Sequence, residues 1–549
     1  MNNLLIFAML LITATSAVAQ GQSSNLRGTK PGAITGTVVN ENGQPLQNVV
    51  VYVRAFSSMR NVQMAVSDSE GNFEVSGLEP QSYQIFARHT VYSLRREDGA
   101  PNNYHVGDSV KLVMVKGGVI TGTVTTRTGE PVVGVRVRVT SVPAGETVQE
   151  RQTDDRGVYR IYGLASGKYV VSAGGGGGFS SDDPYDVDIP TYSPASTRDT
   201  AAVITVRLGD ETPNVDIRYR GEPGRTVSGT VSNAPTGLIG VLVSLSSGEG
   251  GSQLHAVGFP QGDGFIIYGV EDADYTIIAR TIQNSGEWSV SPPQRISVRG
   301  ADVTGIELAL KPLASISGQV VLEELKTKEC GTREAPIVSE TLVSAWHRQD
   351  EAAKALPNFL WGMGTPASAD AQGNFKLQNL APSDYYFVTR FPAKSWYLKS
   401  ITLTSSTTKK VVDAARIWTT VKTSERISGL KITLAEGAAS LNGQVALAEG
   451  ERVPEKLFVY LVPAEKESSD EVLRFYGTEV NPDGKIQLSN LMPGRYWLLS
   501  RPALEGGLTK LREPDATELR TSLRREAEAG KTDIEFKPCQ NVVDYRLKL

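Results

Sequence analysis

Histidine is the side chain most often used for both metal binding and acid–base chemistry, and this chain has four: His89, His105, His255 and His347. No two of them stand at the spacing of ligands that share one metal ion. A zinc peptidase needs clustered His and Glu ligands around an open coordination position. We therefore expect the histidines to be exposed or locally hydrogen-bonded, and we predict no metal site, no cofactor and no catalytic residue.

Carboxylates recur in short Asp-x-x-Gly segments, of which Asp68 to Gly71 is the first and Asp154-Asp155 opens the most acidic. Calcium prefers roughly six to eight oxygen ligands, usually with several carboxylates in one loop. A tight turn needs less, because Asp caps the local backbone and Gly accepts a left-handed conformation. A hairpin turn is therefore favoured over a calcium site.

Cys330 and Cys539 are the only cysteines of the chain. In an exported protein, two cysteines are able to form one disulfide. Such a bridge would join the last two of the repeated units described below. Two free thiols that lie too far apart to bond are the alternative.

Aromatic side chains gather late in the sequence, since five of the six tryptophans follow residue 340. An apolar segment around Phe359 and Trp361 either packs on its own domain or presents a binding surface. Sugar rings stack on flat aromatic faces, so Phe359, Trp361, Trp396 and Tyr397 are the candidates for a ligand-binding patch. Packing of these rings into a core is the favoured alternative.

One repeated block defines the elements that must position these residues. It begins with the tight turn, continues into a strand, passes a Gly-Leu, Gly-Val or Asn-Leu pair and ends on Tyr. From turn Gly to Tyr the distance is 12 residues in four blocks and 11 in the third. The blocks cover residues 68–83, 154–169, 264–275, 370–385 and 481–496. Repetition of this kind predicts a repeated architecture.

Each block is preceded by an opening strand that contains a glycine. These strands are expected at 34–38, 120–124, 227–231, 316–320 and 441–445. Strand alternation puts the glycine on the apolar face, where its missing side chain leaves room for a close neighbour. With a second strand and a closing strand, each unit has roughly seven strands, as in a β-sandwich of two antiparallel sheets.

Residues 34–87 and 120–173 share the pattern G-x-V, G-x-P-L-x-x-V-x-V, T/S-D-x-x-G-x-F/Y and G-L-x-x-G-x-Y. Val132 replaces Leu in the second unit, and Ser82 replaces the last Gly in the first. Here the chain resembles the carboxypeptidase regulatory-like family, closely in these two units, less in the fifth and poorly in the middle of the third and fourth. The resemblance implies a transthyretin-like or immunoglobulin-like sandwich of the carbohydrate-binding-like group, as in bacterial surface and periplasmic proteins. Its motifs imply no activity.

The predicted fold class is all-β, a tandem array of about five such sandwich domains with one short helix near the C-terminus. The expected divisions are a signal peptide 1–19, a linker 20–30, and sandwiches 31–116, 117–222, 223–312, 313–436 (with an insertion) and 437–549 (with the helix). In the helix, Asp515 is the predicted cap, Leu519, Leu523 and Ala527 form one stripe, and Gly530 ends it.

The first 19 residues are typical of a secretory signal. A short apolar run at 4–12 precedes Ala17-Val18-Ala19, which predicts cleavage between Ala19 and Gln20. An uncleaved anchor is the alternative. No later stretch approaches the roughly 20 apolar residues of a membrane helix. We expect an exported protein in the periplasm, on the outer surface or secreted, with no integral membrane segment after cleavage.

Composition narrows the function classes. Hydrophobic residues make up 40% and aromatic residues 7%, which suits globular β domains. The net charge of -4 argues against nucleic acid as a partner, because non-specific binding needs a basic face. The leading hypothesis is a non-catalytic spacer, adhesion or binding module at the cell envelope, with glycans or another envelope protein as partner. Alternatives are a carbohydrate-binding protein that uses the aromatic residues of the last two units, and an enzyme with an unrecognised site.

Overall fold

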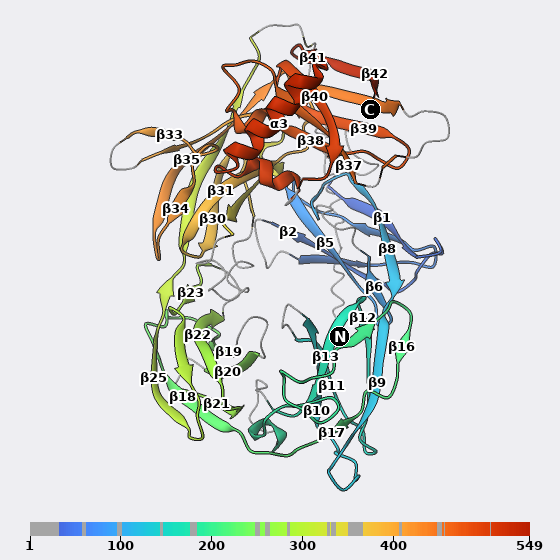
Figure 1. Ribbon diagram of the computed structural model, residues 1–549, viewed down its shortest axis with the longest axis vertical. Helices are drawn as coiled ribbons and strands as arrows, with labels where there is room; N and C mark the ends of the chain where they lie inside the picture. The colour runs from blue at the N-terminus through green and yellow to red at the C-terminus, as the bar shows by residue number, and fades with distance from the viewer. Residues whose placement is uncertain are drawn as a thin grey trace, which may run out of the picture.

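The computed structural model shows a string of paired β-sheets. Ten sheets form within the part of the chain that it describes, and they pair into five sandwiches, numbered 1 to 5 from the N-terminus (Figure 1). The described residues are 32–56, 62–95, 102–142, 147–175, 184–247, 253–258, 264–282, 286–326, 330, 336–349, 366–405, 409–446, 453–454, 456–504 and 507–548. Candidate residues Ala19, Gln20, Phe359 and Trp361 therefore lie outside the described residues.

The first three sandwiches follow one strand order with small variations. Sandwich 1 consists of β1 (Ile34–Asn40), β2 (Val50–Ala55), β3 (Val62–Val66), β4 (Asn72–Val75), β5 (Ser82–Arg88), β6 (Tyr92–Leu94), β7 (Tyr104–His105) and β8 (Ser109–Lys116). Sandwich 2 consists of β9 (Gly118–Thr125), β10 (Arg136–Val142), β11 (Thr147–Gln152), β12 (Val158–Leu164), β13 (Gly167–Ala173), β14 (Thr191–Tyr192), β15 (Ile204–Val206), β16 (Glu211–Thr212) and β17 (Ile217–Arg218), with the 3-10 helix η1 (Pro184–Val187). Sandwich 3 consists of β18 (Arg225–Ser232), β19 (Gly240–Ser246), β20 (Gln253–Gly258), β21 (Gly264–Val270), β22 (Asp274–Ile282), β23 (Ser289–Val290), β24 (Gln294–Ser297), β25 (Val303–Ala309) and β26 (Lys311–Pro312).

The last two sandwiches repeat the plan and add helical elements. Sandwich 4 consists of β27 (Ala314–Glu323), β28 (Leu342–His347), β29 (Ala367–Ser368), β30 (Asn374–Leu380), β31 (Ser383–Arg390), β32 (Trp396–Thr404), β33 (Val411–Asp413), β34 (Thr419–Val421) and β35 (Arg426–Glu436), with η3 (Val338–Glu340). Sandwich 5 consists of β36 (Ala439–Ala446), β37 (Leu457–Pro463), β38 (Tyr476–Glu479), β39 (Lys485–Leu491), β40 (Gly494–Pro502), β41 (Asp533–Phe536) and β42 (Asn541–Lys548), with η4 (Val472–Arg474), η5 (Leu508–Arg512) and the α-helix α3 (Thr517–Gly530).

Each sandwich pairs an opening sheet, which contains the glycine-bearing strand, with a facing sheet. In sandwich 1 these are β4-β1-β8-β6 and β3-β2-β5-β7, and in sandwich 4 they are β30-β27-β35-β32-β33 and β29-β28-β31-β34. A separate cluster of buried apolar side chains fills the space between the two sheets of each sandwich. The all-β fold is confirmed, with one core for each sandwich.

The opening strand pairs with the closing strand in parallel. β1 is antiparallel to β4 but parallel to β8, and the parallel pairing recurs as β9–β17, β18–β25, β27–β35 and β36–β42. The expectation of two antiparallel sheets is therefore confirmed for the facing sheet and wrong for the opening sheet, which contains this parallel pair. The two strands are connected through the facing sheet rather than by a hairpin, so they run in the same direction.

This parallel neighbour explains the opening glycine. A Cβ built on Gly36 would lie 2.0 Å from the carbonyl oxygen of Val110 and 2.8 Å from the ring of Phe73. On the other four opening glycines it would lie 2.0 to 2.5 Å from a carbonyl oxygen, which belongs to the closing strand or, for Gly122, to Val215 two residues before that strand. The predicted close neighbour is confirmed.

The tight turn uses its aspartate on its own backbone. Oδ1 of Asp68 accepts hydrogen bonds from the N–H groups of Glu70 and Asn72, and Asp154 and Asp370 accept the equivalent pairs. Backbone hydrogen bonding lowers the pKa of Asp154. These contacts are those of a capped hairpin turn, which is the interpretation that the sequence favoured.

The tyrosine that ends each block makes the same hydrogen bond in all five sandwiches. Its hydroxyl donates to the carbonyl oxygen four residues earlier, at 2.7 to 2.9 Å. The pairs are Tyr83–Glu79, Tyr169–Ala165, Tyr275–Glu271, Tyr385–Ala381 and Tyr496–Met492. Burial raises the pKa of all five hydroxyls, so they stay protonated donors. This arrangement is a tyrosine corner, which fixes the bend between two strands.

In each block, the first residue of the Gly-Leu, Gly-Val or Asn-Leu pair has a left-handed backbone, and from sandwich 2 onward it lies at the junction with the preceding sandwich. The five residues are Gly77, Gly163, Gly269, Asn379 and Asn490, with φ between 56° and 78°. Glycine and asparagine are the residues that adopt this conformation at least cost. From sandwich 2 onward each of them contacts the preceding sandwich.

At the first two junctions the contact involves backbone. The carbonyl oxygen of Gly163 accepts a 2.9 Å hydrogen bond from Ser93 of sandwich 1. Gly269 packs so closely on sandwich 2 that a Cβ there would lie 2.4 Å from the carbonyl oxygen of Asp188. At both junctions the lack of a side chain on glycine lets two segments of the chain pack closely.

At the last two junctions an asparagine side chain crosses between sandwiches. Oδ1 of Asn379 accepts a 2.8 Å hydrogen bond from the N–H of Trp288 in sandwich 3. Nδ2 of Asn490 donates to the carbonyl oxygens of Ala393 and Trp396 in sandwich 4, at 2.8 and 2.7 Å. Consecutive sandwiches are thus joined by specific hydrogen bonds.

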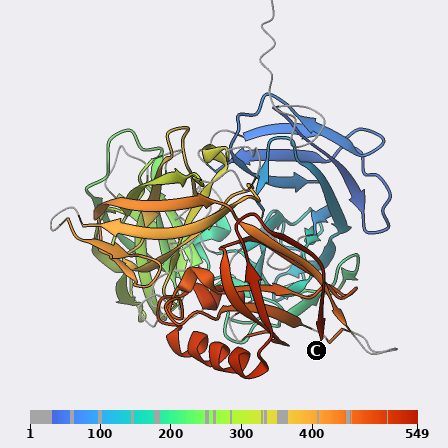
Figure 2. The same cartoon turned by 90° about the horizontal axis from the view of Figure 1, so that it is seen from above.

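The chain turns back on itself, so that sandwich 1 also meets sandwich 4 (Figures 1 and 2). The hydroxyl of Ser82, at the start of β5, donates a 2.9 Å hydrogen bond to the carbonyl oxygen of Glu340. The hydroxyl of Ser339 donates to the carbonyl oxygen of Pro80. This contact joins parts of the chain that are about half its length apart in sequence, as the spacing of 258 residues shows.

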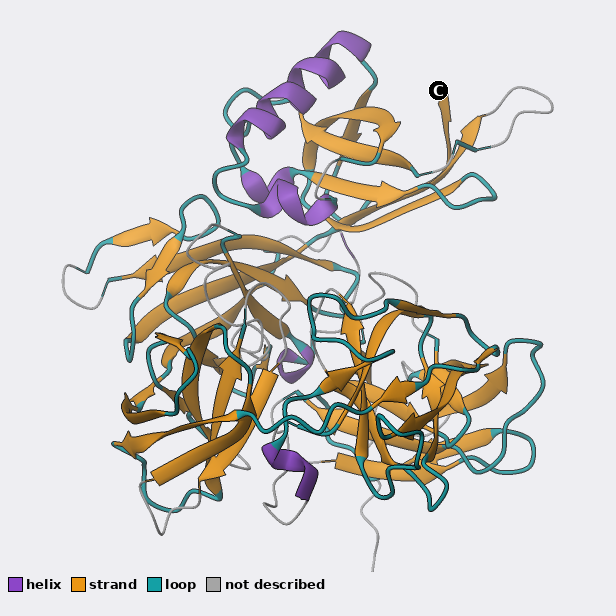
Figure 3. Cartoon of the chain, turned by 60° about the horizontal axis from the view of Figure 1, so that its bottom comes forward, coloured by secondary structure: helices purple, strands orange, loops and turns teal. Residues whose placement is uncertain are grey.

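Helix α3 lies along the outside of sandwich 5 (Figure 3). Leu523 and Ala527 are fully buried against β37 and β40, and Leu519 packs beside them, so the predicted stripe is confirmed. The predicted cap is wrong. The helix begins after Ala516 without a side-chain cap, and Asp515 instead pairs with Arg348 of sandwich 4 at 2.8 Å.

Candidate functional site

A cleft of about 380 Å³ opens where the facing sheets of sandwiches 1 and 4 meet. It is lined by Phe56, Gln84, Asn102, Leu342, Ser344, Ala345, Trp346, His347, Gln349, Pro366 and Arg390. Two sheets that are remote in sequence form the walls, so the cleft exists only because the chain turns back. Crevices between domains are frequent ligand sites.

Strand β28 forms one wall. Alternate residues of a strand face opposite sides, so Val343 is buried in the core of sandwich 4 while Leu342, Ser344 and Trp346 share the outer face. Trp346 is 42% exposed, whereas Leu342 is 2% exposed. The wall therefore runs from a closed end at Leu342 to an accessible indole at Trp346.

The indole of Trp346 is supported from its own sheet. The ring of Tyr386, opposite it on β31, has its centre 6.5 Å away, and Tyr386 in turn meets Trp418 edge-on at 5.6 Å. Burial raises the pKa of Tyr386 to about 12, with a smaller contribution from the charge of Glu513, so its hydroxyl stays neutral. An aromatic face held in this way is a rigid surface for a ligand.

Sandwich 1 contributes polar groups to the opposite wall. Nη2 of Arg54 donates a 2.6 Å hydrogen bond to Oε1 of Gln84, and the guanidinium lies 4.8 Å from the ring centre of Phe86. Oδ1 of Asn102 accepts a 2.9 Å hydrogen bond from the N–H of Ile85. Nδ2 of Asn102 is buried and has no hydrogen-bond partner among the described residues. A buried donor of this kind beside a cleft is available to an acceptor that enters the cleft.

The charge of the cleft comes from Arg390, at the end of β31. It is exposed, and no carboxylate stands among the described lining residues. His347 also lines the cleft, with Nδ1 3.0 Å from the carbonyl oxygen of Arg348 and Nε2 3.1 Å from Nε2 of Gln349. The described lining thus combines an indole, an imidazole, three amides and one guanidinium, and these groups are able to bind a polar ligand.

The sequence-based candidates are not brought together. Trp396 is 2% exposed inside the core of sandwich 4, so a binding role for its ring is corrected to core packing. Tyr397 is half-buried on the other face of β32, and burial raises its pKa. Strand alternation separates these two neighbours, and neither lines the cleft.

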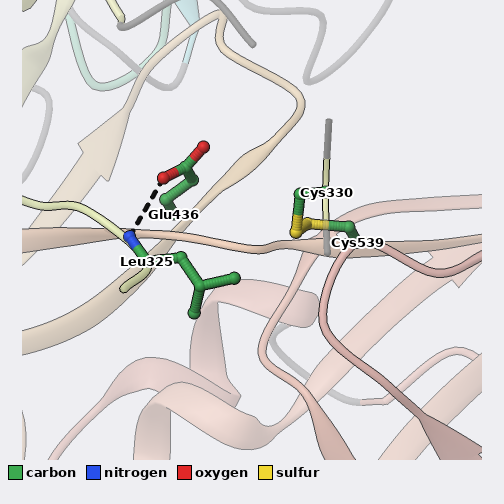
Figure 4. Close-up of a disulfide and its surroundings, with 4 residues drawn as sticks. All are labelled: Leu325, Cys330, Glu436 and Cys539. Carbon is green, nitrogen blue, oxygen red and sulfur yellow. Dashed lines mark hydrogen bonds between the residues drawn. A yellow bond between two sulfur atoms is a disulfide. The ribbon is translucent and has the colours of Figure 1, made fainter. Parts of the chain in front are cut away.

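The two cysteines form a disulfide between sandwiches 4 and 5 (Figure 4). Cys330 and Cys539 are 209 residues apart in sequence and 5.6 Å apart at their Cα atoms. The N–H of Cys539 donates to the carbonyl oxygen of Gly437, in the segment that links the sandwiches, and Glu436 accepts a 3.0 Å hydrogen bond from the N–H of Leu325. The bridge therefore lies beside the connection between the two sandwiches and restricts its movement.

A second hollow, of about 290 Å³, lies within sandwich 5 beneath η5. It is lined by residues that include Tyr476, Leu508 and Arg512. Arg512 lies 5.6 Å from the ring centre of Tyr476 and donates a hydrogen bond to the carbonyl oxygen of Val472, both within sandwich 5. Among the described residues, no three potential ligands are placed to hold a metal ion.

Comparison with known families identifies part of the chain. Residues 33–107 and 119–218 match the carboxypeptidase regulatory-like domain. These segments are sandwiches 1 and 2, the two units whose sequence pattern is most complete. The carboxypeptidase regulatory-like match thus includes only one wall of the cleft. No curated protein matches the sequence.

The solved structures that match this chain show only a distant likeness to it. The minor pilin GBS52 of Streptococcus agalactiae is 13% identical, over 33% of this chain and 92% of that one, with a TM-score of 0.19. The TIE protein of Bacillus anthracis is 10% identical over 92% of this chain and 76% of that one, with a TM-score of 0.16. Two B repeats of the collagen binding protein of Staphylococcus aureus are 12% identical over 74% and 100%, with a TM-score of 0.14. Likenesses this distant leave the function of the chain to its own residues.

Proposed function

We propose that this chain is an exported, non-catalytic binding protein of the cell envelope, and that its ligand binds in the cleft between sandwiches 1 and 4. The cleft carries the proposal, because its lining combines an exposed Trp346 with a buried amide donor of Asn102 that has no partner among the described residues. A ligand that covered the indole would remove apolar surface from water.

Export is supported by the disulfide as well as by the signal-like N-terminus. Disulfides persist in oxidising compartments such as the periplasm and the cell exterior. The bridge between Cys330 and Cys539 therefore fits an exported chain. Among the described residues no helix is long and apolar enough to cross a membrane.

Junctions at every step favour a rigid binding body. Each sandwich is held to its neighbour by at least one close contact at its left-handed residue, and sandwich 1 is held to sandwich 4. A spacer or adhesion role fits the same body, with its ends at a fixed separation. In this proposal, sandwiches 2, 3, 4 and 5 begin at residues 117, 223, 313 and 437, as the sequence predicts.

Glycans are the second candidate partner, and we place their binding site in the cleft rather than at the aromatic residues proposed from the sequence. The indole and amides of the cleft offer the stacking face and the hydrogen-bond donors that sugars need. The aromatic residues proposed from sequence, Trp396 and Tyr397, do not supply them.

A binding array tests the proposal. The full-length mature chain is applied to arrayed glycans and purified envelope polymers as wild type, as Trp346→Ala and as Tyr268→Ala. Tyr268 is also an exposed aromatic side chain, at 38%, but lies on sandwich 3 away from the cleft. We expect signals that Trp346→Ala loses and Tyr268→Ala keeps, with equal melting temperatures. Signals that survive in Trp346→Ala, or the lack of any signal, contradict the proposal.

A further inference from the structure

The polar lining of the cleft between sandwiches 1 and 4 has an asymmetric chemistry. Gln84, Asn102 and Gln349 supply neutral amides, and Arg390 supplies a positive charge. No aspartate or glutamate stands among the described lining residues, although acidic residues outnumber basic ones in the chain as a whole. The guanidinium of Arg390 and the neutral amides favour a polar ligand with a negatively charged group.

Arg390 is placed for a charged ligand group. No ion pair to it occurs within the described part of the chain, whereas Arg348, on the same sheet, pairs with Asp384 and Asp515. A guanidinium offers donors in a planar fork that matches a carboxylate. Arg390 is therefore the one cation of the described lining that lacks a protein anion.

The remaining groups select a ring with hydroxyl groups. Trp346 presents a flat apolar face, and such faces pack against the C–H surfaces of sugar rings. Nδ2 of Asn102 is a donor without a partner among the described residues, and an acceptor on the ligand would satisfy it. An amphipathic ring with oxygen acceptors satisfies both groups at once.

The spacing of the groups indicates the size of the ligand. Leu342 pairs with Arg390 and Trp346 pairs with Tyr386 in the register of β28 and β31. Trp346 and Arg390 are therefore four residues apart along the strands, which corresponds to roughly 13 Å. That distance exceeds one sugar ring, so two or more linked rings are needed to reach both side chains.

We propose that the cleft binds an acidic oligosaccharide, with one ring stacked on Trp346 and the carboxylate of another ring paired with Arg390. This inference rests on the proposed function of the cleft and names its ligand class. Asn102 donates to a ring or hydroxyl oxygen between the two anchors. A neutral glycan would use Trp346 and leave Arg390 unpaired.

Matched ligands separate the acidic from the neutral class. Binding of the full-length mature chain is measured by calorimetry for three pairs: tri-galacturonate with tri-galactose, tri-mannuronate with tri-mannose, and sialyllactose with lactose. We expect at least one acidic member to bind about tenfold or more tightly than its neutral counterpart, as charge-assisted hydrogen bonds allow. Raised salt should reduce that preference.

Variants locate the preference. Arg390→Gln should remove the acidic advantage and leave neutral binding unchanged, while Trp346→Ala should weaken both members of the pair. Arg295→Gln is the control for charge, because Arg295 is exposed on β24 of sandwich 3. Tyr268→Ala is the control for the loss of an aromatic ring. Circular dichroism melts verify that all four variants fold.

The outcomes distinguish this inference from the function on which it rests. Equal binding of acidic and neutral ligands that still depends on Trp346 overturns the acidic class and leaves the cleft as the site. An acidic preference that survives in Arg390→Gln overturns the role of Arg390. Binding that Trp346→Ala leaves unchanged overturns both proposals, and the lack of binding by all six saccharides overturns the saccharide class.

Discussion

The junction between sandwiches 4 and 5 and the junction between sandwiches 2 and 3 use the same position of the repeat in opposite ways. At the first, Asn490 extends a side chain that donates two hydrogen bonds to sandwich 4. At the second, Gly269 has no side chain, and the backbone near Asp188 occupies the space. Both residues have positive φ. One left-handed turn thus serves either as an anchor or as a point of close approach.

The junctions also differ in what surrounds that residue. Between sandwiches 4 and 5 there is a disulfide, and Arg348 pairs with Asp515. Between sandwiches 2 and 3 the backbone makes the contacts, such as the hydrogen bond from the N–H of Gly224 to the carbonyl oxygen of Val187 and the isolated bridge between Asp188 and Pro223. Side chains therefore fasten the C-terminal pair, and close backbone packing fastens the earlier one. Each mode predicts a different sensitivity to substitution.

Removal of the disulfide should have the largest effect. The double variant Cys330→Ser with Cys539→Ser should lose roughly 3 to 5 kcal/mol, because the bridge closes a very long loop in the unfolded chain. Tryptophan fluorescence in a denaturant series reports this, since sandwiches 4 and 5 contain most of the tryptophans. A reducing agent should destabilise wild type equally and leave the variant unchanged. Unfolding curves that coincide for variant and wild type would contradict the special strength of this junction.

Gly269→Ala tests the close-approach junction. The new Cβ would meet the carbonyl oxygen of Asp188 at 2.4 Å on a left-handed backbone, so we expect a loss of about 2 to 4 kcal/mol. Gly77→Ala is the matched control, because Gly77 has similar φ but nothing within 4 Å of its Cβ position, and it should lose only about 1 kcal/mol. Calorimetric melts of the two variants give the comparison. Equal losses would mean that the junction contributes nothing beyond backbone strain.

Asn490→Gly tests the anchored junction without backbone strain. Glycine keeps the left-handed conformation and removes the two hydrogen bonds to sandwich 4, so the loss should be about 1 to 2 kcal/mol. Asn233→Gly is the control, since Asn233 also has positive φ, is exposed and lies away from any junction. The tryptophan-detected unfolding transition measures both. If the control loses as much as Asn490→Gly, the amide does not act as an anchor.

The smallest effect is expected at the junction of sandwiches 3 and 4, and it depends on pH. Lys376 and then Arg426 lower the pKa of Glu287. The ionised carboxylate therefore stabilises the fold fully at pH values above about 4.3, the ordinary pKa of a glutamate. That contribution is lost as pH falls through the lowered value. Because the groups are partly exposed, it should stay below about 1 kcal/mol. Glu287→Gln should flatten this part of the stability profile between pH 3 and about pH 5, and an unchanged profile would contradict the ion pairs.

Repeated local patterns in the sequence carry the architecture of single sandwiches. The opening glycine, the Asp-x-x-Gly turn and the terminal Tyr each act within a few residues or one strand pair, as Gly36, Asp68 and Tyr83 show. Residues that act on near neighbours can be recognised from residue type and spacing alone. The strand and turn motifs predicted the all-β fold in this way, and helical spacing predicted the apolar stripe of helix α3. The role of Tyr83 as a corner was missed, although its regular spacing was visible.

Some predictions from local patterns were wrong, because the tertiary structure gives the same residues other neighbours. Asp515 had the position of a helix cap, but Arg348 of another sandwich pairs with it. Trp396 and Tyr397 were predicted to form a ligand-binding patch, but the indole of Trp396 faces the core of sandwich 4 from β32. Strand direction was another case, because β1 and β8 are brought together by the facing sheet and not by a shared turn.

The sequence by itself therefore determined the repeat, its turns and its strands, because hydrogen bonds between near neighbours follow residue type and spacing. Only the tertiary structure decided the junctions, the pairing of Cys330 with Cys539 and the cleft. Trp346 and Asn102 belong to different sandwiches, and no local pattern records that they line the same cleft. Their proximity depends on the angles at successive junctions, which fix where the chain returns and so place Ser82 against Glu340.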